Sequence, residues 1–234
     1  MVVKKKTVII TAISLIFVIA ISVTLGVFLK SEKASAFGKK VIVIDAGHGG
    51  PDRGVVGKNG TAEADKNLEI AQLRSAVLTD AGFYVVMTRT TERGDDEAAS
   101  YKSEDFARRK RIIEKACPDM VISVHCNKFP SPMRRGAQVF FNRLNRSGVL
   151  LGQALQTELN TLNEAHVGRT YEALHGEYFM LNCSDAPSVI VECGFLSNAE
   201  DEALLKDAAY LEALCDALCA GVIAFFDTHA VQGA

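Results

Sequence analysis

Short apolar runs rich in valine and isoleucine recur along this chain, and longer segments with helical periodicity separate them. Residues 41–45, 120–125 and 188–193 are three such runs, each of a length typical of a buried strand. Further strands are expected at 83–88, 137–142 and 178–181, and helices at 65–81, 103–116, 147–163, 199–206 and 208–227. Strands that alternate with helices form a largely parallel sheet covered on both faces. We therefore expect an α/β protein with a six-stranded, mostly parallel sheet flanked by helices.

Two local signals refine the helix boundaries. Gly82 follows the apolar positions of the first helix and is expected to end it. Ser103 is expected to cap the second helix, because Glu104 and Asp105 come next and acidic residues are favourable in a first turn.

An uncharged segment of 23 residues, 7–29, follows Lys4, Lys5 and Lys6 near the N-terminus. A membrane-spanning helix needs about 20 apolar residues, and a lysine cluster favours keeping its own end in the cytoplasm. We expect residues 1–37 to be a membrane anchor and linker. A cleaved signal peptide stays open, because Ala34-Ser35-Ala36 is an acceptable cleavage site, although the apolar core of a signal peptide usually runs to about 7–15 residues. Both interpretations export residues 38–234 as one folded domain.

The exported part of the chain is acidic. Residues 1–37 hold five of the 26 basic and one of the 28 acidic side chains, so residues 38–234 carry 21 basic and 27 acidic residues. A protein with general affinity for nucleic acid needs a basic surface. This composition excludes nucleic acid as a partner.

The six cysteines form no C-x-x-C pair, which argues against a zinc ribbon. Cys215 and Cys219 lie four residues apart in an apolar helix and are expected in the core. A disulfide stays open, because exported proteins can form them.

Polar residues follow three of the expected strands. The first strand runs into Asp45-Ala46-Gly47-His48-Gly49-Gly50, the third ends at His125, and the last contains Glu192 in an otherwise apolar run. The glycines do not make a dinucleotide-binding loop, because Asp52 replaces the last glycine of G-x-G-x-x-G and Pro51 precedes it. In open α/β sheets the site lies at the carboxyl ends of the strands, so these residues are the candidates for chemistry.

Two histidines and one carboxylate are the ligand set of many catalytic zinc sites, which leave a fourth position open for water. Taken alone, His125 is more often a hydrogen-bonded structural residue, and Glu63 reads as an ordinary acid at a helix start. Glu192 is harder to explain, because burying an unpaired carboxylate costs several kcal/mol. Together, His48, Glu63 and His125 are expected to hold Zn²⁺, with Glu192 as the acid that moves a proton from the attacking water to the leaving nitrogen.

Four motifs carry a resemblance to a known family. They are the segment from Ile42 to Gly50, Glu63 ahead of Asn67-Leu68, the segment from Ile122 to Asn127, and the segment from Val191 to Asn198. Over about residues 40–227 the chain resembles the zinc N-acetylmuramoyl-L-alanine amidases of the Amidase 3 family.

The resemblance implies a six-stranded α/β fold and hydrolysis of the amide bond between N-acetylmuramic acid and L-alanine in peptidoglycan. It also implies that His48, Glu63 and His125 are zinc ligands and that Glu192 is catalytic. The chain departs from the family at Ala46, Cys126 and Asn182, which stand where the family usually has proline, alanine and, frequently, a basic residue. The last of these bears on substrate contacts.

A finer likeness is to the germination-specific cortex amidases of spore formers. It rests on the short exported chain with one N-terminal apolar segment, on Thr90-Thr91-Glu92-Arg93-Gly94, and on the helix at 103–111. This likeness implies action on spore cortex, in the space between the forespore membranes. Whether an accessory protein is needed stays open.

The remaining polar residues are expected to have lesser roles. Arg108, Arg109, Lys110 and Arg111 form a basic run that we expect to be a solvated helix face rather than a docking surface. Arg134 and Arg135 are expected near the substrate, His166 and His175 at the surface with His175 as a modest pocket candidate, and Asn127 as a residue that orients His125 or its loop.

Two other functions fit the same site. A peptidoglycan-binding protein with a vestigial site would keep the fold without activity. A zinc peptidase could act on another amide, although the H-E-x-x-H helix of common metalloproteases is absent.

Overall fold

Six strands form one sheet, in the order β2-β1-β3-β6-β4-β5. A computed structural model of the chain describes residues 38–92 and 102–230, so the expected anchor lies outside the described residues. The strands are β1 (Val41–Ala46), β2 (Tyr84–Met87), β3 (Met120–Asn127), β4 (Gln138–Phe141), β5 (Leu174–His175) and β6 (Ser188–Phe195). All neighbouring pairs are parallel except β4 and β6, which run antiparallel. The expected six-stranded, mostly parallel α/β fold is confirmed.

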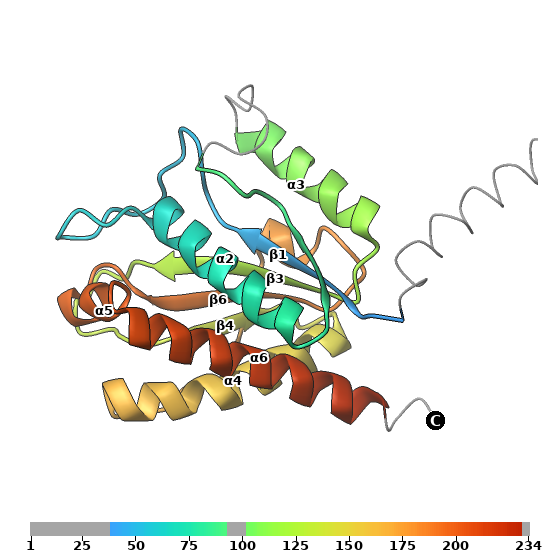
Figure 1. The fold of residues 1–234 in the computed structure, drawn as a ribbon. Coiled ribbons are helices and arrows are strands. Elements are labelled where there is room, and N and C mark those ends of the chain that lie inside the picture. The colour runs from blue at the N-terminus through green and yellow to red at the C-terminus, as the bar shows by residue number, and fades with distance from the viewer. Residues whose placement is uncertain (1–37, 93–101, 231–234) are drawn as a thin grey trace, which may run out of the picture. The chain divides into compact units, whose positions relative to one another are not determined.

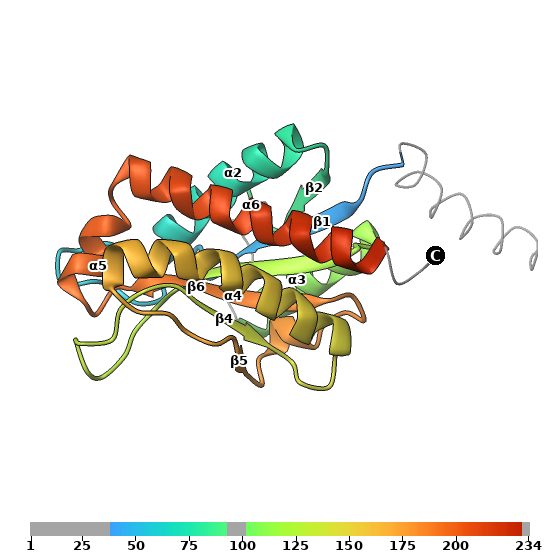
Figure 2. The same ribbon diagram turned by 90° about the horizontal axis from the view of Figure 1, so that it is seen from below.

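Helices cover both faces of the sheet. One face packs against α2 (Glu63–Asp80), α4 (Arg146–Val167) and α6 (Ala208–Ala230), and Figures 1 and 2 show α4 and α6 lying side by side along it. The other face packs against α3 (Lys102–Ala116) and the 3₁₀ helix η1 (Phe179–Leu181). The short helix α5 (Ala199–Leu204) follows β6. This layering buries both faces, as the apolar strands require.

Alternate strand residues build two separate cores. Ile42 and Ile44 of β1 pack on the side of α2 and α6, whereas Val43 between them packs on the side of α3. This alternation is the two-residue period of a strand. Helix α6 is long and apolar enough to cross a membrane by length and composition, but half of its most apolar window is buried in this domain.

The same alternation directs the polar strand residues toward α3. Asp45 pairs in register with Ser123 of β3, and His125 of β3 pairs in register with Glu192 of β6. Parallel strands bring their carboxyl ends to one edge of the sheet, so His125 and Glu192 lie next to each other there. Strand pairing alone therefore brings His125 and Glu192 together.

Two boundary predictions are wrong. The expected strand at 178–181 is the 3₁₀ helix η1, because the chain turns after Tyr178 and the Leu181 N–H donates to the Tyr178 carbonyl. The fifth strand is instead the two-residue β5. Helix α3 already includes Lys102, so Ser103 lies inside the helix and does not cap it. Gly82, with φ +97°, ends α2 as expected.

Candidate metal centre

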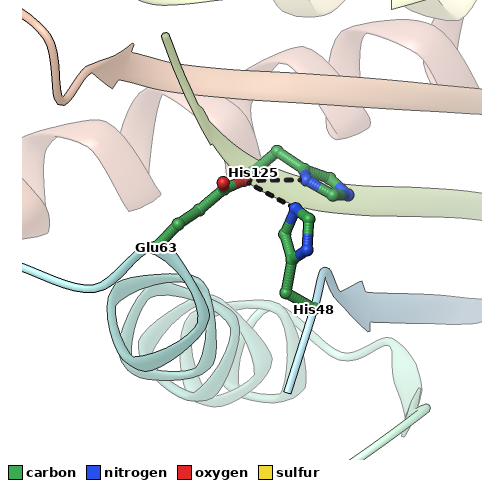
Figure 3. A group of neighbouring side chains, drawn as sticks. All are labelled: His48, Glu63 and His125. Carbon is green, nitrogen blue, oxygen red and sulfur yellow. Dashed lines mark hydrogen bonds and ion pairs between the residues drawn. The ribbon is translucent and has the colours of Figure 1, made fainter. Parts of the chain in front are cut away.

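Three elements bring two imidazoles and one carboxylate together. His48 lies in the loop after β1, Glu63 begins α2, and His125 lies near the end of β3. His48 Nε2 is 3.2 Å and His125 Nδ1 is 3.0 Å from Glu63 Oε1. Figure 3 shows both rings directed toward this one carboxylate oxygen. One ligand atom from each side chain lies within 4.8 Å of the others, a group that could hold a metal ion.

The spacing of these donors suits zinc. Ligands at about 2.0–2.1 Å from a tetrahedral zinc lie about 3.3 Å from one another. The two nitrogen–oxygen separations of 3.2 Å and 3.0 Å are close to that value. Neutral imidazole and carboxylate are also the donors that catalytic zinc sites use.

The backbone and Asn67 hold the Glu63 carboxylate in place. Its Oε2 accepts a hydrogen bond from the Val55 N–H at 2.9 Å, and its Oε1 accepts from the Cys126 N–H at 3.3 Å and from Asn67 Nδ2 at 3.4 Å. Burial alone would raise the pKa of Glu63, but the hydrogen bonds from His125 and His48 outweigh burial and hold that pKa well below its ordinary range. Glu63 is therefore a carboxylate ion, the form that ligates metals.

The loop conformation directs His48 toward Glu63. His48 has φ +60°, which is uncommon for a non-glycine residue and typical of functional sites. Its Nδ1 lies 2.9 Å from Asp52 Oδ2, and this partner leaves Nε2 as the nitrogen that faces Glu63. Burial lowers the pKa of His48, but the hydrogen bonds and charges of Glu63 and Asp52 outweigh burial and raise it overall.

Gly47 is needed because the ring of His125 occupies the space where a Cβ would lie. A Cβ built on Gly47 would be 2.2 Å from His125 Cε1. Any side chain at position 47 would therefore displace the His125 ring. The glycine-rich loop exists for this close approach, not for phosphate binding.

Glu192 lies beside this group with one oxygen unsatisfied. Its Oε2 is buried and has no hydrogen-bond partner among the described residues. Burial raises the pKa of Glu192 to about 7, the His125 charge lowers it and the Glu63 charge raises it. Within one site, Glu63 is thus held ionised while Glu192 can carry or release a proton near neutral pH.

These side chains open into a cavity of about 410 Å³. The polar wall holds His48, Glu63, His125 and Glu192. Aromatic residues also line the cavity: the rings of Phe106 on α3 and Phe179 on η1 stack with their centres 4.8 Å apart, and Tyr178 directly precedes Phe179. The cavity combines an apolar wall with convergent polar groups, as small-molecule sites do.

The expectation of a solvated basic face on α3 is wrong for Arg108 and Arg109. Both side chains are buried, whereas Lys110 and Arg111 are exposed. Arg109 Nη1 contacts Asp45 Oδ1 at 2.5 Å and the Ala46 carbonyl at 2.7 Å, and its Nη2 donates to the His48 carbonyl at 2.5 Å. The two residues point inward because this face of the helix packs on β1 and the loop that carries His48.

Arg89, which is also buried, holds the same loop. Arg89 donates to the carbonyls of Ala46, Gly47 and Ala64 at 2.9, 3.0 and 2.7 Å. These bonds join the loop after β1 to the first turn of α2. Arg89 and Arg109 thus fix the backbone of two of the three donors.

The other sequence-predicted residues lie outside the donor group. Arg135 pairs with Glu200 and Asp201, and Arg134 lies 4.7 Å from the centre of the Tyr171 ring; neither lines the cavity. His166 and His175 are exposed, and His175 does not line the cavity. Asn127 lines it, and its Oδ1 accepts from the Lys128 N–H at 2.7 Å, so it orders its own loop.

Sequence reasoning assigned no role to Asp52, Asn67, Arg89 or Arg109 as supports of the site. The spacing of Asp52 four residues after His48 was the one available signal for them. Cys215 and Cys219 are buried core residues as expected, and no described cysteine is in a disulfide.

Comparison with known proteins agrees with this geometry. Residues 42–224 match the family model Amidase_3, described as N-acetylmuramoyl-L-alanine amidase. The germination-specific N-acetylmuramoyl-L-alanine amidase of Bacillus subtilis is 32% identical over 80% of this chain and 80% of its own. The amidase AmiA of Escherichia coli is 27% identical over 84% of this chain and 80% of its own.

A solved structure of the CwlD amidase from Clostridioides difficile, in complex with the GerS lipoprotein, superimposes with a TM-score of 0.73 at 28% identity. It covers 81% of this chain and 100% of that one. The family match, together with the α/β sheet and the His–Glu–His donor group at its strand ends, defines a peptidoglycan-cleaving hydrolase. The chain belongs to the Amidase_3 family and is an N-acetylmuramoyl-L-alanine amidase. Because peptidoglycan lies outside the cytoplasmic membrane, the family places the activity there.

The buried Asp45–Arg109 pair predicts a specific loss of acid stability. Burial alone would raise the pKa of Asp45, but Arg109 and the hydroxyls of Ser123 and Thr88 lower it from 3.8 to about 2. The unfolded chain therefore binds this proton first, and the contribution of Asp45 to stability is lost as pH falls from about 4 through about 2. In Asp45→Asn the Arg109 charge stays buried without its partner, so the free energy of unfolding at pH 7 should fall by about 3 kcal/mol.

Urea denaturation at pH 7 and pH 3 checks both statements. Asp80→Asn, at the exposed end of α2, is the matched control and should change stability little. An Asp45→Asn variant as stable as wild type at pH 7 would contradict the analysis. An equal loss of stability in wild type and Asp45→Asn between pH 7 and pH 3 would contradict it as well.

Proposed function

We propose that this amidase is zinc-dependent, that His48, Glu63 and His125 hold the ion, and that Glu192 is the catalytic acid and base. The observation that carries the proposal is the buried, unsatisfied Glu192 Oε2 next to a three-donor group with zinc-like spacing. A buried polar atom without a partner is costly unless something else uses it. A water that attacks an amide at this site is such a partner.

The ion and the chain have separate tasks in this proposal. Zinc, when bound, supplies Lewis acidity that polarises the amide carbonyl and makes water a stronger acid. Glu63 supplies negative charge, and Asp52 holds His48 in the tautomer whose Nε2 is free to bind. Arg89 and Arg109 keep the loop after β1 in register with α2.

Glu192 moves the proton. Its carboxylate accepts a proton as water attacks the carbonyl carbon, and then returns a proton to the nitrogen of L-alanine as the carbon–nitrogen bond breaks. A pKa of about 7 suits both steps, because the group can take and release a proton near neutral pH. The stacked rings of Phe106 and Phe179 add an aromatic surface to the same cavity.

We further propose that residues 1–37 are a membrane anchor and linker and that residues 38–234 are the catalytic domain. The uncharged segment 7–29 behind three lysines supports this division. The same segment sets the proposed location of the enzyme on the outer side of the cytoplasmic membrane, between the two forespore membranes if the source forms spores.

The proposed role is in spore cortex maturation and germination. It is supported by the 32% identity to the germination-specific amidase of Bacillus subtilis. The solved relative in complex with a lipoprotein supports an accessory protein partner for this chain as well.

Replacement of Glu192 tests the proton transfer. Glu192→Gln should lower kcat by at least about 100-fold, because general acid–base catalysis contributes roughly 10²–10⁴-fold. Zinc content and the circular dichroism spectrum should match wild type, since Glu192 is not a proposed ligand. Glu212→Gln, on the exposed face of α6, is the control. A fully active Glu192→Gln enzyme would refute the role.

Digestion of purified peptidoglycan tests the bond, the metal and the role together. Mass spectrometry should detect stem peptides that begin with L-alanine, and a zinc chelator should abolish them. Cortex should be a better substrate than vegetative wall. Release that persists without metal would rule out zinc dependence, equal rates on both walls would argue against the cortex role, and full activity of the chain alone would argue against a required partner.

Fractionation of cells tests the anchor. The full chain should sediment with membranes and stay there after a high-salt wash, because an apolar span, unlike a charged surface, is insensitive to salt. A chain that lacks residues 1–37 should be soluble. A mature protein that begins after Ala36 would show that the segment is a cleaved signal peptide instead.

A further inference from the structure

The cavity is rich in carboxylates, and its cations are almost all paired. Asp45 and Asp105 both contact Arg109, at 2.5 and 2.6 Å, and Glu63 contacts the two histidines. Lys128 differs: within residues 38–92 and 102–230, its ammonium group makes no ion pair and no hydrogen bond. Lys128 is exposed and lines the cavity. Lys128 thus brings an unpaired ammonium group to a cavity in which Arg109 is already paired with Asp45 and Asp105.

The backbone around Lys128 is held from both sides. Asn127 Oδ1 accepts from the Lys128 N–H at 2.7 Å, and the Asn127 carbonyl accepts from the Leu196 N–H at 2.9 Å. The next N–H, of Phe129, donates to Ser197 Oγ at 3.0 Å. An ordered backbone with a free side chain is the arrangement of a binding residue, because little backbone entropy is lost when a ligand binds.

The sheet is irregular directly before Lys128. The pairing register of β3 and β6 shifts between His125 and Asn127. Such bulges re-aim side chains beside active sites. Lys128 is therefore placed by the same strand end that positions His125.

Resting on the function proposed above, we propose that Lys128 binds a carboxylate of the stem peptide, namely the free α-carboxylate of the residue that follows L-alanine. In peptidoglycan that second residue is a D-glutamate joined through its side chain, which leaves the α-carboxylate free. It lies about two residues from the bond that is cut, or roughly 7 Å. Lys128 is three residues from His125, roughly 10 Å along the strand, and its four-carbon stem can span the difference.

The alternative is an ordinary solvated lysine. Exposed ion pairs contribute little in water, so a surface lysine would give no measurable discrimination. At Lys128 the substrate itself covers the cavity and removes water from the pair, which strengthens the attraction.

Two synthetic muramyl tripeptides isolate this contact. One is N-acetylmuramoyl-L-alanyl-γ-D-glutamyl-L-lysine, and the other carries a carboxamide in place of the D-glutamate α-carboxylate. The zinc-loaded full-length enzyme should have a kcat/KM about tenfold higher for the carboxylate, as a charge-assisted hydrogen bond gives. Lys128→Met should bring the ratio of the two values to about one, and Lys128→Arg should keep most of the preference.

Lys110→Met, an exposed lysine on α3 outside the cavity, is the control and should keep the wild-type ratio. High salt should shrink the wild-type preference and leave Lys128→Met unaffected. A wild-type ratio near one, or an unchanged ratio in Lys128→Met, would overturn the assignment while leaving the amidase itself intact. If the zinc-loaded enzyme digests purified peptidoglycan but cleaves neither compound, the carboxylate subsite alone fails. If it digests neither the compounds nor peptidoglycan, the proposed function fails with it.

Discussion

The site depends on one buried ion pair, between Asp45 at the end of β1 and Arg109 on α3. Asp45 also accepts hydrogen bonds from Thr88 and Ser123 at 2.6 and 2.5 Å, so it ties three strands and a helix together. Arg109 also donates to the carbonyls of Ala46 and His48 and to Asp105 Oδ2. A buried pair of this kind contributes little net stability. Its consequence is positional, because the guanidinium of Arg109 holds two backbone carbonyls, those of Ala46 and His48, at the start of the loop.

The pKa values of two glutamates in this site are shifted in opposite directions, and that contrast makes the site chemically useful. Glu63 accepts from two imidazoles and three further donors, so its charge is stabilised and its pKa is low. Glu192 has a buried oxygen with no donor, so its pKa rises to about 7. Environments that push the pKa values of paired acids apart commonly separate a fixed charge from a proton carrier. The proposed division between ligand and proton carrier follows from this difference in hydrogen bonding.

Much of this arrangement could be predicted from the sequence, for identifiable reasons. The valine- and isoleucine-rich runs predict the central strands, since strands of a parallel sheet are buried on both faces. Glu192 is conspicuous because it interrupts one of these runs. The weak β5 could not be found, since two exposed residues carry no period. Arg108 and Arg109 looked solvated because a run of four basic residues conceals which two face inward. Asp52 and Asn67 act through contacts that only the folded loop creates.

The structure separates the parts of the site that the chemistry constrains from those that can vary. The donors sit at strand ends or the first turn of a helix, and each is held by contacts that one substitution would disturb, such as the approach of His125 to Gly47. Lys128 has a held backbone but a side chain that no other group in the described chain needs. In the role proposed for Lys128, a change there alters what the cavity attracts, while the contact of His125 with Glu63 stays in place. Substrate preference can therefore evolve at the end of β3 while the donor group stays intact, which is the usual division between a rigid scaffold and the loops that extend from it.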